Sequence, residues 1–236
     1  MRYFPLLGAV IFLAACQPEE TVEMRAAQRA EEAMAKVTDC AAVQCTTLDL
    51  DGAGIPDYTV LNDMSHLKVL MISYTDFNDL NDIAGLTGLE ELHIGSTSVS
   101  DLTPLSNFAN LRVLHVQNTD FTDIGGLTSL RNLEELAIGQ AHFADISFVQ
   151  SLPKLKTLDI SNADLPGLGA LRGHPALETL ELGYAPISDL TPLLEVRNLK
   201  RLGISDPGGD EALAAQHELL RGRGVVIAYE PVIVLC

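Results

Sequence analysis

Tryptophan is absent from this 236-residue sequence, and all aromatic residues together make up only 5% of it. Aliphatic residues must therefore fill any apolar core. The chain is 47% hydrophobic and 20% charged, which is typical of a folded protein and excludes a disordered one. Its length is enough for one ordinary domain or for one short array of repeats.

Basic residues are also scarce. Lys and Arg number 15 against 32 Asp and Glu, which gives a formal net charge of −17. Proteins that bind nucleic acid need a basic surface, so this balance disfavours DNA, RNA and anionic lipid surfaces as partners. Two interpretations of the acidity remain: it keeps the protein soluble and dispersed, or it matches a basic partner.

The sequence motifs of the common enzyme classes are missing as well. The chain contains no G-x-S-x-G, no H-E-x-x-H, no P-loop and no Rossmann fingerprint. We therefore expect a non-catalytic protein without a cofactor, and the remaining classes of function are binding and structural support.

The N-terminus has the pattern of a targeting signal. Arg2 is followed by an uncharged run, Tyr3 to Ala15, which is shorter than the roughly 20 residues of a membrane-spanning helix. The run ends in Leu13-Ala14-Ala15-Cys16, which resembles the bacterial lipobox. The resemblance implies that residues 1–15 are a lipoprotein signal peptide, that Cys16 carries lipid, and that Gln17 favours the outer membrane. The alternative is an ordinary secretory signal in which the cysteine occurs by chance.

Two segments follow the signal. We assign residues 16–22 to a tether and 23–44 to an N-terminal helical cap, with a helix over 23–37 in which small apolar residues recur at helical spacing. Cys40 and Cys45 bracket the entry into the next segment, and the secretory compartment is oxidising. A disulfide between them would fasten the cap, while two reduced thiols are the alternative. Cys236 is then left over, either free or joining two molecules.

The centre of the chain, residues 45–206, repeats every 22 residues without an insertion. We number the positions within each repeat from one to twenty-two. Positions one, four and six are almost always aliphatic, and a fixed period of this size predicts a solenoid. The eight copies begin at residues 45, 67, 89, 111, 133, 155, 177 and 199.

The repeats resemble leucine-rich repeats. Residues 89–97 are L-E-E-L-H-I-G-S-T, and the motif V/I-S-D-L-T-P-L occurs at 99–105 and again at 187–193. The second half of the repeat is similar to the 22-residue class found in internalins. The resemblance implies a leucine-rich-repeat solenoid of the α/β horseshoe type, with a parallel sheet on its concave face and short 3-10 turns on its convex face.

The last segment, residues 207–236, departs from the repeat and forms a C-terminal cap. Pro207-Gly208-Gly209 breaks the pattern, Asp210 can start a helix that runs to about Arg221, and Val225 to Tyr229 has the composition of a strand. An atypical terminal unit is what a solenoid needs in order to cover the open end of its core.

Recurring polar residues mark the turns. An aspartate at position thirteen, just before each convex turn, accepts hydrogen bonds from free backbone N–H groups, so we interpret it as a cap and not as a catalytic carboxylate. Threonines at position nine, Thr75, Thr97 and Thr119, are expected to bond neighbouring turns. The aspartates are Asp57, Asp79, Asp101, Asp123, Asp145 and Asp189, with Gly167 as the exception.

The concave face is the predicted binding surface. Side chains alternate along a strand, so positions three, five and seven point away from the core. We expect an acidic recognition surface there, and a plain solvated face is the alternative. Its residues are His93, His115, Glu91, Glu135, Asp159 and Glu181, with Tyr74 and Tyr184 at the strand edge.

Two histidines on the concave face are candidate metal ligands. His93 and His115 share position five, so their rings should lie about 4.8 Å apart. Further ligands would come from Glu91 or Glu135, but these lie two residues along the strand, about 7 Å away. We therefore expect no metal site. His174 replaces a leucine at position twenty and is expected to be a half-exposed core residue without a function.

These features predict a membrane-anchored, non-catalytic protein-binding module of the bacterial envelope. Its partner would be a protein and not a nucleic acid. A basic protein would be compatible with the acidity of the chain. One alternative is a structural envelope lipoprotein without a dedicated ligand. The other is a metal-binding or small-molecule-binding protein that uses the two concave histidines.

Overall fold

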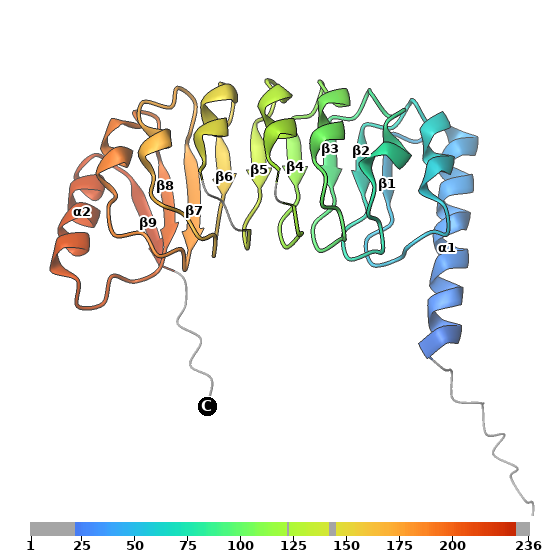
Figure 1. The fold of residues 1–236 in the computed structure, drawn as a ribbon, viewed down its shortest axis with the longest axis horizontal. Helices are drawn as coiled ribbons and strands as arrows, with labels where there is room; N and C mark the ends of the chain where they lie inside the picture. The colour runs from blue at the N-terminus through green and yellow to red at the C-terminus, as the bar shows by residue number, and fades with distance from the viewer. Residues whose placement is uncertain (1–21, 122, 142–144, 230–236) are drawn as a thin grey trace, which may run out of the picture.

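The computed structural model describes residues 22–121, 123–141 and 145–229, which form one curved array of coils (Figure 1). Each coil contributes a strand to a single sheet, and the nine strands found in the described residues all run parallel, in chain order. The strands are β1 Thr47–Asp49, β2 Val69–Met71, β3 Glu91–His93, β4 Val113–His115, β5 Glu135–Ala137, β6 Thr157–Asp159, β7 Thr179–Gly183, β8 Arg201–Ile204 and β9 Val226–Tyr229.

The strands pair in the register that the 22-residue period predicts. From β1 to β7, each residue lies beside the residue 22 positions later, so that Leu92 neighbours Leu114. The side chains at positions four and six point inward, and those of Leu114 and Val116 are 0% exposed. One coil could not bury this face alone, but stacked coils form a continuous core. The predicted leucine-rich-repeat solenoid is therefore confirmed.

Short 3-10 helices form the opposite wall of each coil, and the position-thirteen aspartates cap them. Asp57 Oδ1 accepts a hydrogen bond from the backbone N–H of Thr59 at 2.9 Å, and the other five aspartates make the equivalent bond. The capping role is thus confirmed. Bonds from the side chain and backbone of Thr59 also hold the pKa of Asp57 below its usual value. The helices span Tyr58–Asp63, Leu80–Ile83, Thr103–Asn107, Gly125–Ser129, Ser147–Ser151, Gly169–Leu171 and Thr191–Glu195.

The chain leaves each strand from β1 to β6 through a left-handed residue at position eight. Tyr74, for example, has a φ of 59° and Asn118 a φ of 55°. In the seventh coil the left-handed residue is one position earlier, at Gly183, where the pairing of β7 with β8 also shifts its register. Tyr184 therefore does not have the backbone conformation of Tyr74, although both occupy position eight.

The threonines at position nine were assigned the wrong partner. The Thr97 hydroxyl donates to the carbonyl of Ile94 at 2.7 Å, and Thr75 and Thr119 make the same bond within their own coils. The predicted bond to a neighbouring turn is not the one formed. The reason is local: the acceptor lies only three positions before the donor across the tight exit from the strand, so the nearest free carbonyl belongs to the same coil.

A helix closes each end of the core. Helix α1, Val22–Val43, is six residues longer at its C-terminal end than predicted, and it buries Ala33, Val37 and Cys40. A disulfide joins Cys40 to Cys45, with their Cα atoms 4.9 Å apart. In the ranges described, neither helix has the length and hydropathy needed to cross a membrane.

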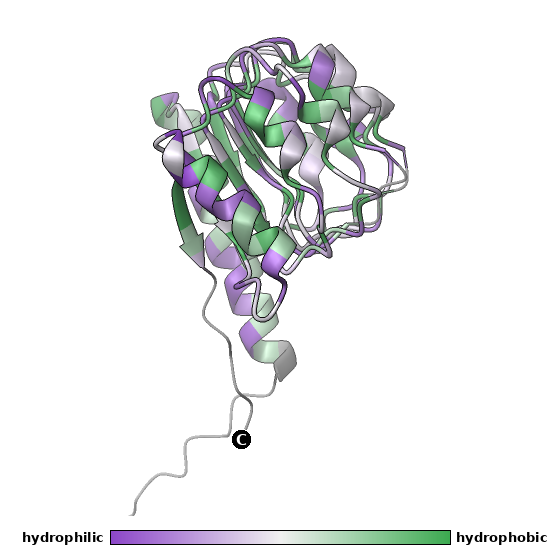
Figure 2. Cartoon of the chain, turned by 90° about the vertical axis from the view of Figure 1, so that its left-hand side faces the viewer, coloured by the Kyte–Doolittle hydropathy of each residue, from purple (hydrophilic) through white to green (hydrophobic). Residues whose placement is uncertain are grey.

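At the other end, helix α2 spans Glu211–Gly222, with the Asp210 carboxylate accepting from the Leu213 N–H at its start. The side chain of Gln216 ties this helix to the seventh coil, because its carbonyl oxygen accepts from the Leu190 N–H at 2.6 Å. Figure 2 looks onto this end of the molecule and shows β9 as a hydrophobic strand beside α2.

His174 is buried and not half-exposed as the sequence suggested. Only 5% of it is exposed, and both ring nitrogens have backbone partners. Nε2 lies 3.2 Å from the carbonyl oxygen of Leu152, and Nδ1 accepts from the N–H groups of Ala176 and Leu177. A neutral imidazole satisfies this arrangement, and burial lowers the pKa of His174. The sequence pattern shows a polar residue in a leucine position but not the backbone groups that surround it.

Candidate functional site

The predicted site residues lie on the concave face of the sheet, the face directed away from the 3-10 helices. Positions three and five of β3 to β7 place their side chains there. Ala137 is buried and the others are half-buried, so they project into solvent less freely than we expected, because neighbours in adjacent strands pack against them. Tyr74 and Tyr184 follow β2 and β7 and are 71% and 49% exposed.

The two concave histidines are direct neighbours. His93 pairs in register with His115, and their ring centroids are 4.3 Å apart with the planes inclined by 62°. Burial and the proximity of His115 lower the pKa of His93, while the charges of Glu91 and other carboxylates act in the opposite direction. His93 is therefore held neutral to a lower pH than a free imidazole.

Contrary to the sequence argument, one carboxylate reaches the histidine pair. The Nε2 atom of His115 lies 2.7 Å from Oε1 of Glu135 on the next strand. The estimate of about 7 Å used backbone spacing alone. Side chains lean along the strand direction, so a residue at position five can meet position three of the following strand.

A second contact follows the same diagonal. Oε1 of Glu181 lies 2.9 Å from Nε of Arg201, which occupies position three of β8. Gly203, beside Glu181 in the register, leaves the necessary space, because a Cβ atom there would overlap the Glu181 carboxylate. Arg201 was not among the predicted site residues, although a basic residue at an outward position was visible in the repeat.

The other two acidic residues differ in their bonding. Asp159 Oδ1 accepts from the Ser161 N–H at 2.9 Å, so one of its oxygens already helps to fix the exit from β6. The Glu91 carboxylate makes no hydrogen bond or ion pair with any part of the chain that the structure describes. The centre of the concave face thus has carboxylate oxygens that are free to accept bonds from a partner.

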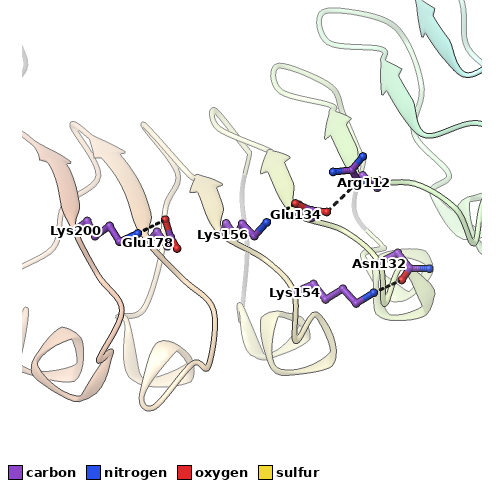
Figure 3. A network of polar contacts seen from close by, with 7 residues as sticks. All are labelled: Arg112, Asn132, Glu134, Lys154, Lys156, Glu178 and Lys200. Carbon is purple, nitrogen blue, oxygen red and sulfur yellow. Dashed lines mark hydrogen bonds and ion pairs between the residues drawn. The ribbon is translucent and has the colours of Figure 1, made fainter.

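A separate charged row was missed entirely. At position two, just before each strand, basic and acidic residues alternate along the solenoid (Figure 3). Glu134 contacts both of its neighbours: Oε1 lies 2.9 Å from Arg112 Nε and Oε2 lies 2.6 Å from Lys156 Nζ. We call this row the charge ladder. Its members are Lys68, Glu90, Arg112, Glu134, Lys156, Glu178 and Lys200.

The members of the charge ladder pair with one another. Hydrogen bonds from Lys156 and Arg112 lower the pKa of Glu134 to about 2. Lys68 lies 3.3 Å from Glu90, and Lys200 lies 2.8 Å from Glu178. Each ladder member thus has a partner of opposite charge, and the row of four basic and three acidic residues has a net charge of +1. On the adjacent concave face, by contrast, Glu135 meets only a histidine. The alternation of sign every 22 residues is a signal from which sequence analysis could have found the ladder.

Among residues 22–121, 123–141 and 145–229, no group of three or more His, Cys, Asp or Glu side chains is placed to hold a metal ion. What the concave face offers is a row of hydrogen-bond acceptors, two imidazoles and two exposed tyrosines on a stiff sheet. Such a surface can bind an extended, cationic or hydrogen-bond-donating partner.

No protein-family model and no curated protein matches the sequence of this chain. Solved structures do match. An internalin (inlF) of Listeria monocytogenes is 28% identical, with a TM-score of 0.61 over 66% of this chain and 46% of its own. A Leptospira interrogans LRR protein, at 21% identity and a TM-score of 0.62, matches over 78% of this chain and 46% of its own, which shows the fold alone. The chain thus spans about half the length of these two proteins.

The match to internalin C2 of Listeria monocytogenes is more complete. It is 30% identical, has a TM-score of 0.62, and covers 67% of this chain and 70% of the internalin. The 22-residue register, the parallel sheet and the capped 3-10 turns agree with that likeness. On this sequence identity and coverage, the chain belongs to the leucine-rich-repeat proteins.

Proposed function

We propose that this chain is a lipid-anchored, non-catalytic module of the bacterial envelope that binds a basic protein partner on its concave face. The observation that carries the proposal is the contrast between neighbouring rows of charge. Every member of the charge ladder has a partner of opposite charge, whereas the Glu91 carboxylate has no partner in the described chain and Glu135 meets only a histidine. Unmatched carboxylates on a rigid concave sheet favour a partner that brings positive charge.

Support for the anchor comes from the N-terminal sequence. The lipobox residues Leu13 to Cys16 lie outside the described residues, so the anchor rests on the resemblance. Helix α1 begins six residues after Cys16, and its first turns, Met24 to Arg29, are exposed and extend past the sheet (Figure 1). Such a helix could serve as a stalk between the lipid and the solenoid. We propose the outer membrane as its location, because Gln17 follows the cysteine.

The anchor is tested by labelling cells with a radioactive fatty acid. The wild-type protein should incorporate label and fractionate with the outer membrane, and Cys16→Ser should abolish incorporation because the thiol is the acceptor. Cys236→Ser is the matched control and should label normally. A wild-type protein without label, or a Cys16→Ser variant that labels equally, would show that Cys16 is not the lipid site.

The binding surface is tested by photo-crosslinking in the native cells. Photoreactive residues at positions 93 and 159 should capture one recurrent protein. The same residue at position 106, where Ser106 is exposed on the convex side, should not capture it. If all three positions give the same products, or none gives a product, the concave face is not a recognition surface. The structural-lipoprotein alternative would then be favoured.

The charge of the partner is tested by reversing a concave carboxylate. Glu91→Lys should weaken binding of the crosslinked partner by about tenfold or more, and raised salt should weaken wild-type binding, because exposed charge pairs are screened. Glu31→Lys, on the exposed side of α1, is the control with the same change in net charge. Equal effects of the two substitutions would indicate a response to net charge alone.

A further inference from the structure

The last strand of the sheet has an open edge. The Val226 N–H donates to the carbonyl oxygen of Lys200 at 2.8 Å, which directs the Val226 backbone toward β8. Successive residues of a strand direct their backbone groups to alternate sides, so those of Ile227 and Tyr229 point away from the sheet. No other segment of the described chain forms hydrogen bonds with that side of β9. These backbone groups are a template for another strand.

Two common protections of an edge strand, charge and proline, are missing from β9, which is short at four residues. Its sequence, V-I-A-Y, contains no charge and no proline, and its pairing with β8 has no irregularity. Val226 is 62% exposed, and Leu219 on the adjacent α2 is 56% exposed. Figure 2 shows this hydrophobic strand beside α2 on the end face. The opposite end is different, because α1 and the Cys40–Cys45 disulfide lie next to β1.

We propose that β9 is a self-association site at which a second copy of this chain adds its own β9 in antiparallel orientation. A two-fold axis would place each outward N–H of one β9 against an outward carbonyl of β9 in the second copy. The edge is therefore complementary to an identical edge. The two sheets would then continue into each other. This site is separate from the concave carboxylates, and its test does not depend on the proposed binding partner.

The distribution of charge selects a second copy as the occupant. Two chains of net charge −17 repel each other, but the end that contains β9 is close to neutral. Joining the chains at this end keeps their acidic concave centres apart. Between residues 197 and 229 the basic residues are Arg197, Lys200, Arg201, Arg221 and Arg223, and the acidic ones are Asp206, Asp210, Glu211 and Glu218.

The C-terminal sequence provides a reporter for this contact. Seven residues, 230–236, follow β9 and end in Cys236. An extended chain of that length reaches at most about 25 Å, so two copies paired at β9 have their Cys236 thiols within reach of each other.

The association is measured by sedimentation equilibrium of the full chain carrying Cys236→Ser, in excess detergent matched in density to the solvent. We expect a mass of two chains that dissociates on dilution. Val226→Lys should weaken association by about tenfold or more, because a charged side chain on an edge strand disfavours the addition of another strand. Val43→Lys is the matched control at the other end of the molecule, where Val43 is 75% exposed, and it should change nothing.

Two results would overturn the proposal. One is a mass of a single chain at every concentration, and the other is a two-chain mass that Val226→Lys leaves unchanged. A thermal melt of each variant checks that the solenoid remains folded. Val226→Glu is a second edge variant and should act in the same direction as Val226→Lys.

Thiol crosslinking in membranes is the independent measurement. Oxidised glutathione accepts the two electrons and two protons that two Cys236 thiols release, giving one disulfide between chains and two molecules of reduced glutathione. Wild-type chains should form a reducible two-chain band, Cys236→Ser should form none, and Val226→Lys should slow its formation. Equal rates for wild type and Val226→Lys would show that the β9 edges do not meet.

Discussion

The two faces of the sheet come from the same strands but follow different rules. At positions four and six, which face inward, every coil from the second to the seventh has Leu, Ile or Val and buries it almost fully. At position five, which faces outward, the residue changes from His115 to Ala137 to Asp159 in successive coils. Coils stacked at constant spacing require side chains of constant volume inside, whereas the outer face has no such restriction. Variation on the concave face is therefore where recognition can be encoded.

The largest expected difference between the faces is in stability. Leu114→Ala should lower the free energy of unfolding by about 2–5 kcal/mol, because it leaves a cavity between coils on both sides. His115→Ala, the next residue along the strand, should change it by less than about 1 kcal/mol, since half-exposed positions lose little packing. Urea denaturation of both variants measures the difference. Similar values for the two would contradict the assigned register.

The next effect is the dependence of stability on pH. Burial lowers the pKa of His93, His174 and His217 in the folded state. The neighbouring His115 lowers the pKa of His93 further, and Arg221 does the same for His217. An unfolded histidine titrates near pH 6.5, so below that pH the unfolded chain takes up protons that the folded chain does not. Stability should therefore fall as the pH decreases from 7.5 to 5.5.

Urea denaturation at several pH values checks this prediction. In this window carboxylates with ordinary pKa values stay ionised, so the histidines dominate the slope. The variant His174→Leu, which restores the residue common at position twenty, should have a smaller loss of stability on acidification than the wild type. An unchanged slope would mean that His174 titrates in the folded protein as it does in the unfolded chain.

A smaller effect, on affinity alone, is expected from the paired imidazoles. Replacing His93 and His115 together with Ala should weaken binding of the captured partner several-fold and leave the melting temperature nearly unchanged, because both rings lie on the outer face. Binding and melting are measured on the same preparation. Full-strength binding would place recognition elsewhere, for instance on α1, and unfolding would show that the histidines are structural.

The smallest effect compares two adjacent glutamates. Glu134→Gln removes the centre of the charge ladder, and Glu135→Gln removes the partner of His115. Both should shift the urea midpoint only slightly, because exposed ion pairs contribute little. Only Glu135→Gln should weaken binding of the partner, since of these two residues only Glu135 lies on the concave face. Equal losses of binding would extend the recognition surface to the ladder.

The sequence was a better guide to the backbone than to side-chain contacts. The 22-residue period was sufficient to predict that Leu92 lies beside Leu114, because parallel register copies the period. It could not predict that His115 reaches Glu135, because that contact depends on how two flexible side chains lean across neighbouring strands. The charge ladder is an intermediate case. Its alternation of sign is visible in the sequence, but the contacts follow only once the position-two residues of successive coils are known to lie side by side.

By itself, the sequence determined the repeat, the inward face, the aspartate caps and the positions of both terminal helices. Each of these depends on local chemistry repeated at a fixed interval, so one copy predicts the others. The tertiary structure decided which polar groups meet: the backbone bonds of His174, the Glu181–Arg201 pair beside Gly203, and the open edge of β9. These depend on what lies across from a residue in a neighbouring coil, or on the absence of a further coil, and neither is present in the local sequence.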